Sequence, residues 1–326
     1  MALVDLTRDE LERYQPEREE PADFDAFWQA RVAEARAART DPVISLEPRD
    51  TRMRSVAVQD VTFAGYAGEP VRGWYLRPAG VAADVPLPVL VEFLGYGRGR
   101  GRPQEHLFWA GTGYAHLVMD MRGQGFWCPG ETPDGPYSPA GGPAVFITRG
   151  IQDPRTSYYT RLFTDAVRAV DTARALPGVD PGRLAVMGIS QGGGTAIAAA
   201  GLADVDALVA DVPFLCHIRR AVDLTDSRPY SEVTDYLRTY PTGADAALRT
   251  LSYIDGMNHA ARGRAPALFS VGLHDDICPP STVYAAYHQY AGAKRMQVWP
   301  WSDHASGGTE QRLVELAFLD EVLGET

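Results

Sequence analysis

The chain has 326 residues, of which 45% are hydrophobic and 22% are charged, as is typical of a globular protein with a large apolar core. The net charge of −11 and the lack of basic clusters argue against partners such as nucleic acid or an anionic membrane surface. Its cysteines, Cys128, Cys216 and Cys278, are three in number and widely spaced, which fits neither a disulfide framework nor a zinc site.

The N-terminal region is expected to be helical. Thr7 and Glu10 fit a capping box, and apolar residues such as Phe24 and Trp28 recur at helical spacing. We interpret residues 1–40 as an N-terminal helical extension that packs on the main domain. The region has no signal-peptide pattern, and no stretch of the chain has the length and apolarity of a membrane span, so we expect a cytoplasmic protein.

Strand-like and helix-like segments alternate along the rest of the chain. The expected strands are 56–63, 71–77, 89–94, 115–119, 184–188, 207–211, 267–271 and 296–300. Helices are expected at 158–176, from Gly192 onward, at 280–290 and at 309–323. This alternation predicts an α/β fold, a mainly parallel sheet flanked by helices, in a single domain over 1–326.

Two segments interrupt the alternation. Residues 125–150 are rich in Gly and Pro and are interpreted as a long excursion at the rim of the fold or at an interface. Residues 214–262 are mostly helical and are interpreted as an insertion above the carboxyl edge of the sheet.

A serine lies between two glycines where an expected strand turns into a helix. Gly188, Ser190 and Gly192 form a G-x-S-x-G pattern, and this pattern in a strand–turn–helix context is typical of a nucleophile elbow. Glycine is needed on both sides because side chains there would collide with neighbouring elements. The unpaired amides of the following helix would also lie close to a developing negative charge.

A serine hydroxyl needs a base, and the base needs an orienting acid. In this fold the order along the chain is Ser, acid, His, and His304 alone among the histidines lies between the last strand and the last helix. Asp275 and Asp276 both follow strand 267–271, and we favour Asp275, although the sequence leaves Asp276 open. Asp211 is the second choice for the acid, and Asp303 is too close to His304 in sequence.

An oxyanion hole needs two N–H donors. One is the amide that follows the nucleophile, which belongs to Gln191. The glycine-rich loop 95–103 follows strand 89–94 and can turn an amide inward, and we expect Tyr96 to supply the second donor.

Several segments together resemble the acetyl xylan esterase and cephalosporin-C deacetylase family, carbohydrate esterase family seven. The segments are RGQG (122–125), GISQGGG (188–194), DVPFLCH (211–217), SVGLHDDICPPSTV (270–283) and DH…GG (303–308). The resemblance extends through nearly the whole chain, including residues 148–170 and the N-terminal helices.

The resemblance implies an α/β-hydrolase fold with Ser190 as nucleophile, Asp275 as acid and His304 as base, and with the amides of Tyr96 and Gln191 as oxyanion donors. It implies hydrolysis of acetyl esters on short xylooligosaccharides and on cephalosporin C, without a metal or an organic cofactor. It also implies a homo-oligomer, a hexamer built as a trimer of dimers. The family pattern has Glu after the catalytic His, whereas this chain has Ala305, which leaves substrate preference and rate open.

Other polar and aromatic residues of these segments are given supporting roles. Arg122 is expected to pair with a carboxylate such as Asp120 and, with Gln124, to hold the oxyanion and elbow loops in place. Side chains expected either to line an acyl or sugar pocket or to pack in the core are Trp109, Trp127, Phe214 and Pro229.

The sequence leaves two other functions open. One is a different acyl hydrolase on the same fold, such as another short-acyl carboxylesterase, a thioesterase or a peptidase. The other is a non-catalytic, hydrolase-like binding protein, against which the intact serine, acid and histidine positions argue.

Overall fold

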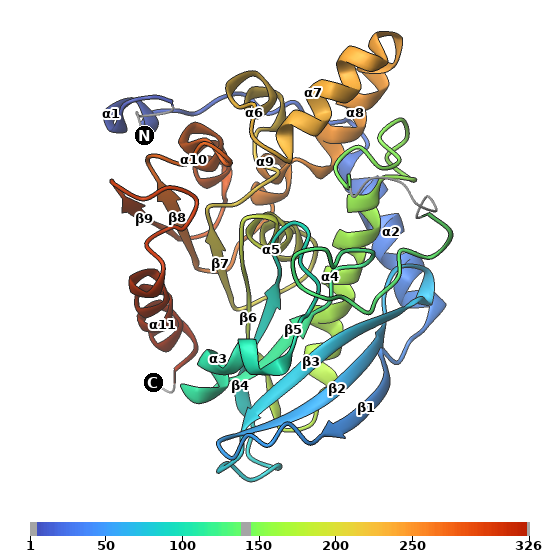
Figure 1. Cartoon of the computed structure of the whole chain (residues 1–326), viewed down its shortest axis with the longest axis vertical. Coiled ribbons are helices and arrows are strands. Elements are labelled where there is room, and N and C mark those ends of the chain that lie inside the picture. The colour runs from blue at the N-terminus through green and yellow to red at the C-terminus, as the bar shows by residue number, and fades with distance from the viewer. Residues whose placement is uncertain (1–4, 138–144, 325–326) are drawn as a thin grey trace.

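The computed structural model describes residues 5–137 and 145–324, and a nine-stranded sheet runs through its centre (Figure 1). The strands are β1 (Val43–Arg49), β2 (Val56–Ala64), β3 (Pro70–Pro78), β4 (Leu87–Phe93), β5 (Ala115–Met119), β6 (Val179–Ile189), β7 (Ala207–Asp211), β8 (Ala267–Gly272) and β9 (Lys294–Trp299). Their order in the sheet is β1-β2-β3-β5-β4-β6-β7-β8-β9.

Most of the sheet is parallel. Strands β5, β4, β6, β7, β8 and β9 pair in parallel, whereas β1, β2 and β3 pair antiparallel and join the rest through β3 and β5. The predicted α/β class with a mainly parallel sheet is therefore confirmed. Strand β1 was not expected. It lies at the edge of the sheet, its residues are exposed or half-buried, and its segment VISLEPR has too few apolar residues to be recognised as a strand.

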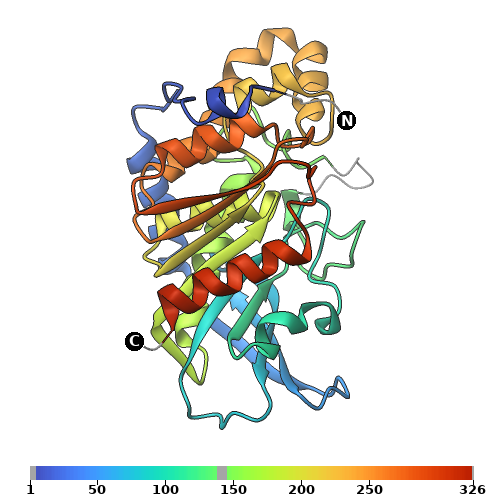
Figure 2. The same ribbon diagram turned by 90° about the vertical axis from the view of Figure 1, so that its left-hand side faces the viewer.

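Helices cover the two faces of the sheet unequally. One face carries α2 (Phe24–Ala38), α4 (Tyr158–Ala175), α5 (Gln191–Leu202), α9 (Gly256–Ala260) and α10 (Pro280–Gln289). The opposite face carries only the short α3 (Leu107–Gly111) and the long α11 (Thr309–Leu323) among the described helices. In Figure 2, α11 crosses in front of the sheet and α3 lies apart from it.

The alternation of side chains along a strand divides the core between these faces. On β4, Val89 and Val91 join the large cluster beneath α4 and α5, whereas Leu90 joins a smaller cluster with Phe318 and Leu319 of α11. Complete burial of such a side chain contributes about 1.5–3 kcal/mol. Both faces of β4 are thus buried, which explains its continuous apolar run.

The described helices outside these layers lie near the chain start and above the carboxyl ends of the strands (Figure 1). They are α1 (Arg8–Leu11), α6 (Ile218–Leu224), α7 (Tyr230–Thr239) and α8 (Ala244–Ile254). Short 3-10 turns occupy Tyr66–Gly68, Pro103–His106, Gly135–Tyr137 and Pro241–Gly243. Helices α6 to α9 fall within the segment 214–262, between β7 and β8, where a helical insertion was expected.

The segment 125–150 is only partly described, because residues 138–144 lie outside the described range. Its first part is held by Asp120, whose Oδ2 accepts from the amides of Glu131 (2.6 Å) and Thr132 (2.7 Å). Asp134 lies further along and accepts from the guanidinium of Arg149 at 2.9 Å. Buried carboxylates therefore fix the described part of this excursion to the domain.

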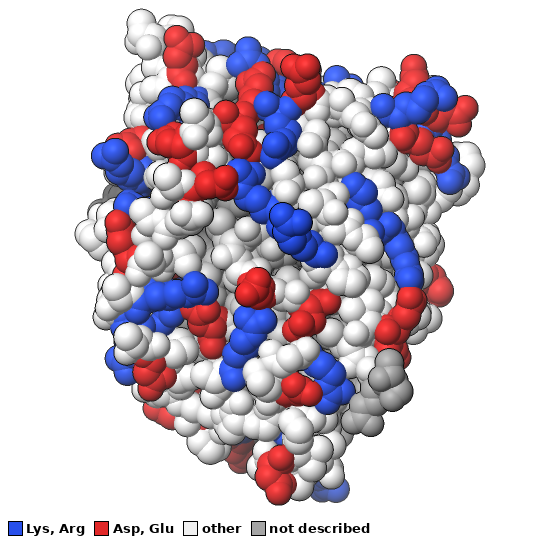
Figure 3. Space-filling model, turned by 180° about the vertical axis from the view of Figure 1, so that it is seen from behind, with Lys and Arg blue, Asp and Glu red and all other residues white. Residues whose placement is uncertain are grey.

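On the face shown in Figure 3, positive and negative side chains are intermingled rather than gathered into a field of one sign. None of the helices within the described ranges combines the length and apolarity needed to cross a membrane.

The N-terminal segment is tied to the main body through α2. Phe24 and Trp28 are each 1% exposed, and the Trp28 Nε1–H donates to the carbonyl of Tyr253 at 3.0 Å. The Trp28 ring also packs on Phe163 of α4 and His259 of α9, with centroid distances of 5.9 and 5.1 Å. Helix α2 is therefore part of the folded core.

We expect Trp28→Ala to lower the free energy of unfolding by about 3–5 kcal/mol, because it leaves a cavity and removes the hydrogen bond from the indole to the Tyr253 carbonyl. Urea unfolding followed by circular dichroism measures this change. Gln29→Ala, at an exposed position of the same helix, is the control and should change it by less than about 0.5 kcal/mol. Equal effects of the two substitutions would show that α2 is not part of the core.

Candidate active site

Ser190 occupies a tight turn between β6 and α5. Its backbone has φ 58° and ψ −119°, a conformation that side-chain-bearing residues rarely adopt. A Cβ on Gly188 would lie 2.4 Å from the carbonyl carbon of Gly192, and a Cβ on Gly192 would lie 2.0 Å from the carbonyl oxygen of Phe93. The flanking glycines are thus required by close backbone contact, as the G-x-S-x-G pattern predicted.

Three residues distant in sequence meet at this turn. His304 Nε2 lies 2.9 Å from Ser190 Oγ, and His304 Nδ1 lies 2.7 Å from Asp275 Oδ2. Asp275 is fully buried, and its Oδ1 accepts from the amides of Ile277 and Cys278 at 2.9 Å each. The imidazole can therefore accept the serine proton while the carboxylate orients it and stabilises its positive charge.

The other aspartates considered for the acid lie elsewhere. Asp276 has its Oδ2 3.4 Å from Ser227 Oγ, and Asp211 accepts from Gln311 Nε2 at 2.8 Å. Asp303 accepts from the amide of Ala305 at 2.9 Å. Among the four, Asp275 is the aspartate that contacts His304.

Two backbone amides next to the nucleophile are unpaired. Gln191 is the first residue of α5, and Tyr96 follows β4 in a loop that lines the same pocket. Neither amide donates a hydrogen bond to any other group in the described part of the chain. Both are thus available to an oxyanion, in agreement with the expected hole.

Gln124 connects the two loops that carry these amides. Its Oε1 accepts from the amide of Gly97 at 2.5 Å, and its Nε2 donates to Gln191 Oε1 at 2.8 Å. Gln191 Nε2 donates in turn to the carbonyl of Leu94 at 3.1 Å. These side chains are nearly or completely buried, so they fix the spacing between the two amides.

Arg122 has a supporting position but a different partner from the one expected. Its guanidinium donates to Asp165 (2.8 Å) and to Glu69 (2.8 Å), not to Asp120. Asp120 is not available to Arg122, because its carboxylate already accepts from three backbone amides, those of Arg100, Glu131 and Thr132. The Arg122 carbonyl accepts from Tyr158, which also bonds Gln124, so Arg122 still supports the Gln124 bridge.

The pocket in front of Ser190 has a volume of about 430 Å³. Pro229, Phe126 and Trp127 line it together with Ser190 and His304. Trp127 is 74% exposed, so one wall of the pocket is an aromatic side chain with an open face. Pro229 therefore lies where it was expected, and Phe126 was missed because its neighbours in the loop carry no regular pattern.

Two residues expected as pocket candidates lie outside this pocket. Trp109 is 1% exposed and packs between Phe108 and Tyr114 on the α3 side of the sheet. Phe214 is fully buried and packs on Tyr230, with ring centroids 4.6 Å apart. Phe214 therefore packs in the core, and Trp109 packs among aromatic side chains and lines a different cavity on that side of the sheet.

A buried carboxyl group in the pocket was not anticipated. Glu232, on α7, is 6% exposed, lines the pocket and accepts from the Tyr96 hydroxyl at 2.7 Å. Burial raises the pKa of Glu232 to about 7. The Tyr96 hydroxyl also accepts from the amide of Phe146 at 2.7 Å. No sequence signal links Glu232 to Tyr96, because the two are 136 residues apart.

We expect Gly192→Ala to disrupt the turn, because the new methyl group must displace the Phe93 carbonyl. Overpacking of this kind costs about 1–3 kcal/mol, and a shift of the nucleophile slows its reactions about 10²-fold. Thermal unfolding and the rate of labelling by a fluorophosphonate measure the two effects. Gly111→Ala, where a Cβ meets nothing within 4 Å, is the control and should leave both unchanged.

Glu232 should make stability depend on pH. A carboxyl with a raised pKa in the folded state adds stability that is complete below the unfolded pKa of about 4.3 and is lost as pH rises through about 7. We therefore expect Glu232→Gln to reduce the loss of unfolding free energy between pH 5 and pH 8 by about 1–2 kcal/mol, after allowance for solvent screening. Urea unfolding at both pH values tests this, with Glu310→Gln, an exposed site, as control. An unchanged pH slope would contradict it.

The sequence and the structure both match known proteins. The family model for acetyl xylan esterases (AXE1) matches residues 1–322. A solved acetyl xylan esterase from Paenibacillus sp. R4 is 38% identical, with a TM-score of 0.90 over 98% of this chain and 100% of that one. Acetyl xylan esterase 1 from Thermoanaerobacterium sp. JW/SL YS485 is 30% identical, with a TM-score of 0.87 over 97% of this chain and 99% of that one.

A curated relative extends the comparison. Acetyl esterase Axe7A of Xylanibacter ruminicola is 26% identical over 304 residues, which is 90% of this chain, and the chain spans 65% of the length of that relative. These matches confirm the resemblance seen in the sequence and the α/β-hydrolase fold that it implied. The chain belongs to the acetyl xylan esterase family.

Proposed function

We propose that this protein is a serine esterase that removes acetyl groups from acetylated xylooligosaccharides and from cephalosporin C. The single observation that carries the proposal is the chain of contacts from Ser190 Oγ to His304 Nε2 (2.9 Å) and from His304 Nδ1 to Asp275 (2.7 Å). The family and its solved members support the acetyl ester as substrate.

The proposed reaction has two halves. His304 takes the proton of Ser190 as the oxygen attacks the acetyl carbonyl, and the amides of Tyr96 and Gln191 hold the oxyanion. His304 then gives the proton to the leaving sugar oxygen, which leaves the acetyl group on Ser190. Water, deprotonated by His304, attacks this acetyl-enzyme and releases acetate.

The pocket also bears on the length of the acyl group. Its apolar side chains, which include Ile277 and Pro229, lie beside the nucleophile. One additional methylene changes binding by only about 1–3 kcal/mol, so discrimination against propionyl esters should be modest. Profiling with simple esters of increasing acyl length separates this esterase from another acyl hydrolase on the same fold, such as a thioesterase or a peptidase.

Acetate release from acetylated xylobiose and from cephalosporin C tests the proposal. We expect Ser190→Ala and His304→Ala each to lower the rate about 10⁴-fold or more, because the nucleophile and the base act as a unit. Ser55→Ala, at an exposed serine, is the matched control and should retain full rate. Unchanged acetate release from Ser190→Ala would refute the mechanism, and a wild-type protein inactive on both substrates would refute the proposed substrates.

The hexamer and the cytoplasmic location expected from the sequence stay predictions.

A further inference from the structure

A second cavity of about 480 Å³ lies beside the catalytic pocket, on the thinly covered face of the sheet. Helices α3 and α11 are the helices that flank it, and its floor includes Met187 and Gly188 of β6. Ile189 lines both this cavity and the catalytic pocket, and Ala305 and Ser306, which follow His304, form part of its rim. The two spaces are therefore adjacent, with the nucleophile turn between them.

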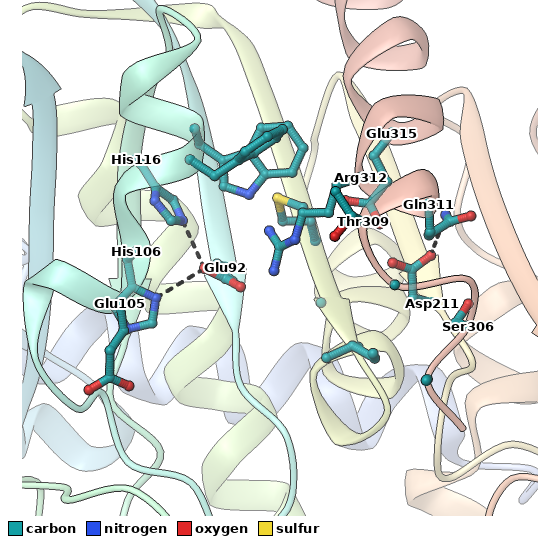
Figure 4. Close-up of a pocket in the computed structure, with 17 residues that line it drawn as sticks. Glu92, Glu105, His106, His116, Asp211, Ser306, Thr309, Gln311, Arg312 and Glu315 are labelled. Atoms are coloured by element: carbon teal, nitrogen blue, oxygen red, sulfur yellow. Dashed lines mark hydrogen bonds and ion pairs between the residues drawn. The ribbon is translucent and has the colours of Figure 1, made fainter. Parts of the chain in front are cut away.

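Polar groups line this cavity from opposite sides (Figure 4). On one side Glu92 Oε2 lies 3.0 Å from His116 Nε2 and 3.5 Å from His106 Nδ1. On the other side Asp211 accepts from Gln311, and Glu315 lies beside it. These side chains are all at least nine-tenths buried, so the cavity has a built polar lining.

The lining combines acidic and basic side chains. Burial disfavours the Glu92 carboxylate, but the two imidazoles hold its pKa well below the usual range, and Glu92 raises the pKa of His106 against the effect of burial. Burial lowers the pKa of His116 and raises that of Glu315 next to Asp211. The lining thus holds a carboxyl group beside two imidazoles on one side and two neighbouring carboxyl groups on the other.

Arg312 is a further positively charged side chain of this lining. It projects from α11 into the space between the two sides, and it forms no ion pair with any carboxylate of the described residues (Figure 4). Because Glu105 also lines the cavity, the lining as a whole carries groups of both signs rather than a cluster of one sign that would select a free anion or a free cation. A neutral molecule with many hydroxyl groups suits it, because carboxylate and amide oxygens accept from hydroxyls and Arg312 donates to them.

Unsatisfied donors and acceptors point to the same kind of ligand. The indole N–H of Trp109 and the Nδ1 of His116 are buried, belong to lining residues and have no hydrogen-bond partner among the described residues. A buried polar atom without a partner costs about 1–3 kcal/mol, and a bound hydroxyl removes that cost. Each of these atoms can form a hydrogen bond with one hydroxyl group of a ligand in the cavity.

We propose that this cavity is a subsite for an unacetylated sugar residue of the same xylooligosaccharide whose acetylated residue occupies the pocket at Ser190. The inference rests on the proposed function and adds to it the length of the preferred substrate. Acetylated xylotriose spans both spaces, whereas an acetylated monosaccharide fills only the catalytic pocket. Its volume lies within the range of small-molecule sites.

The test fills the cavity without removing any buried group. Thr309 is exposed at the start of α11 and lines the cavity, so Thr309→Trp places an indole in its mouth. Leu313→Trp adds the same side chain to the same helix at a position that is 51% exposed and outside the cavity. The readout is the ratio of kcat/KM for acetylated xylotriose to kcat/KM for p-nitrophenyl acetate.

We expect Thr309→Trp to lower this ratio about tenfold or more, through a higher KM for acetylated xylotriose. Leu313→Trp should leave the ratio unchanged. Equal ratios for the two variants, with wild-type activity on acetylated xylotriose, would overturn the subsite and leave the proposed function standing. Calorimetric titration of the Ser190→Ala protein with unacetylated xylotriose is independent of catalysis. Binding that is lost in Ser190→Ala/Thr309→Trp and kept in Ser190→Ala/Leu313→Trp supports the subsite, and absence of binding overturns it.

Discussion

The strained turn at Ser190 is the constraint on which the rest of the site depends. A non-glycine residue at φ 58° costs about 1–3 kcal/mol, and surrounding contacts must hold it there. The Ser190 amide donates to the carbonyl of Asp211 at 2.9 Å, and its carbonyl accepts from the amide of Phe214 at 2.9 Å. The turn is thus anchored to the end of β7, and the close contact of Gly192 with Phe93 anchors it to β4.

Buried polar side chains transmit this anchoring to the loops around the serine. Gln124 and Gln191 connect the Tyr96 loop with the turn. Gln124 also donates to the Tyr158 hydroxyl, which in turn donates to the Arg122 carbonyl. Such a network stabilises the fold only when every polar group in it is paired. The free-energy cost of one unpaired buried polar group is about as large as the stabilisation from several exposed hydrogen bonds. The fixed spacing of the two oxyanion amides is a consequence of this complete pairing.

The unequal covering of the sheet explains why this face holds a polar cavity. Beneath α4 and α5 the sheet is covered by a large apolar cluster, whereas α3 is only five residues long and leaves space beside α11. In that space lie the carboxyl groups of Glu92 and Asp211, near the carboxyl ends of their strands. No sequence pattern indicated this cavity, because its lining combines residues from seven separate elements and the loop after His304.

Local sequence was sufficient to predict the alternation of strands and helices, the G-x-S-x-G turn, and the positions of Asp275 and His304 after the last strands, because periodicity and local backbone sterics act over a few residues. The tertiary structure alone decided the contacts between distant segments: Asp275 rather than Asp276 on the imidazole, Asp165 rather than Asp120 on Arg122, and Glu232 on Tyr96. It also placed Trp109 and Phe214 in the core. Such choices depend on the direction of each side chain and on which partner is already occupied, and no local pattern records either.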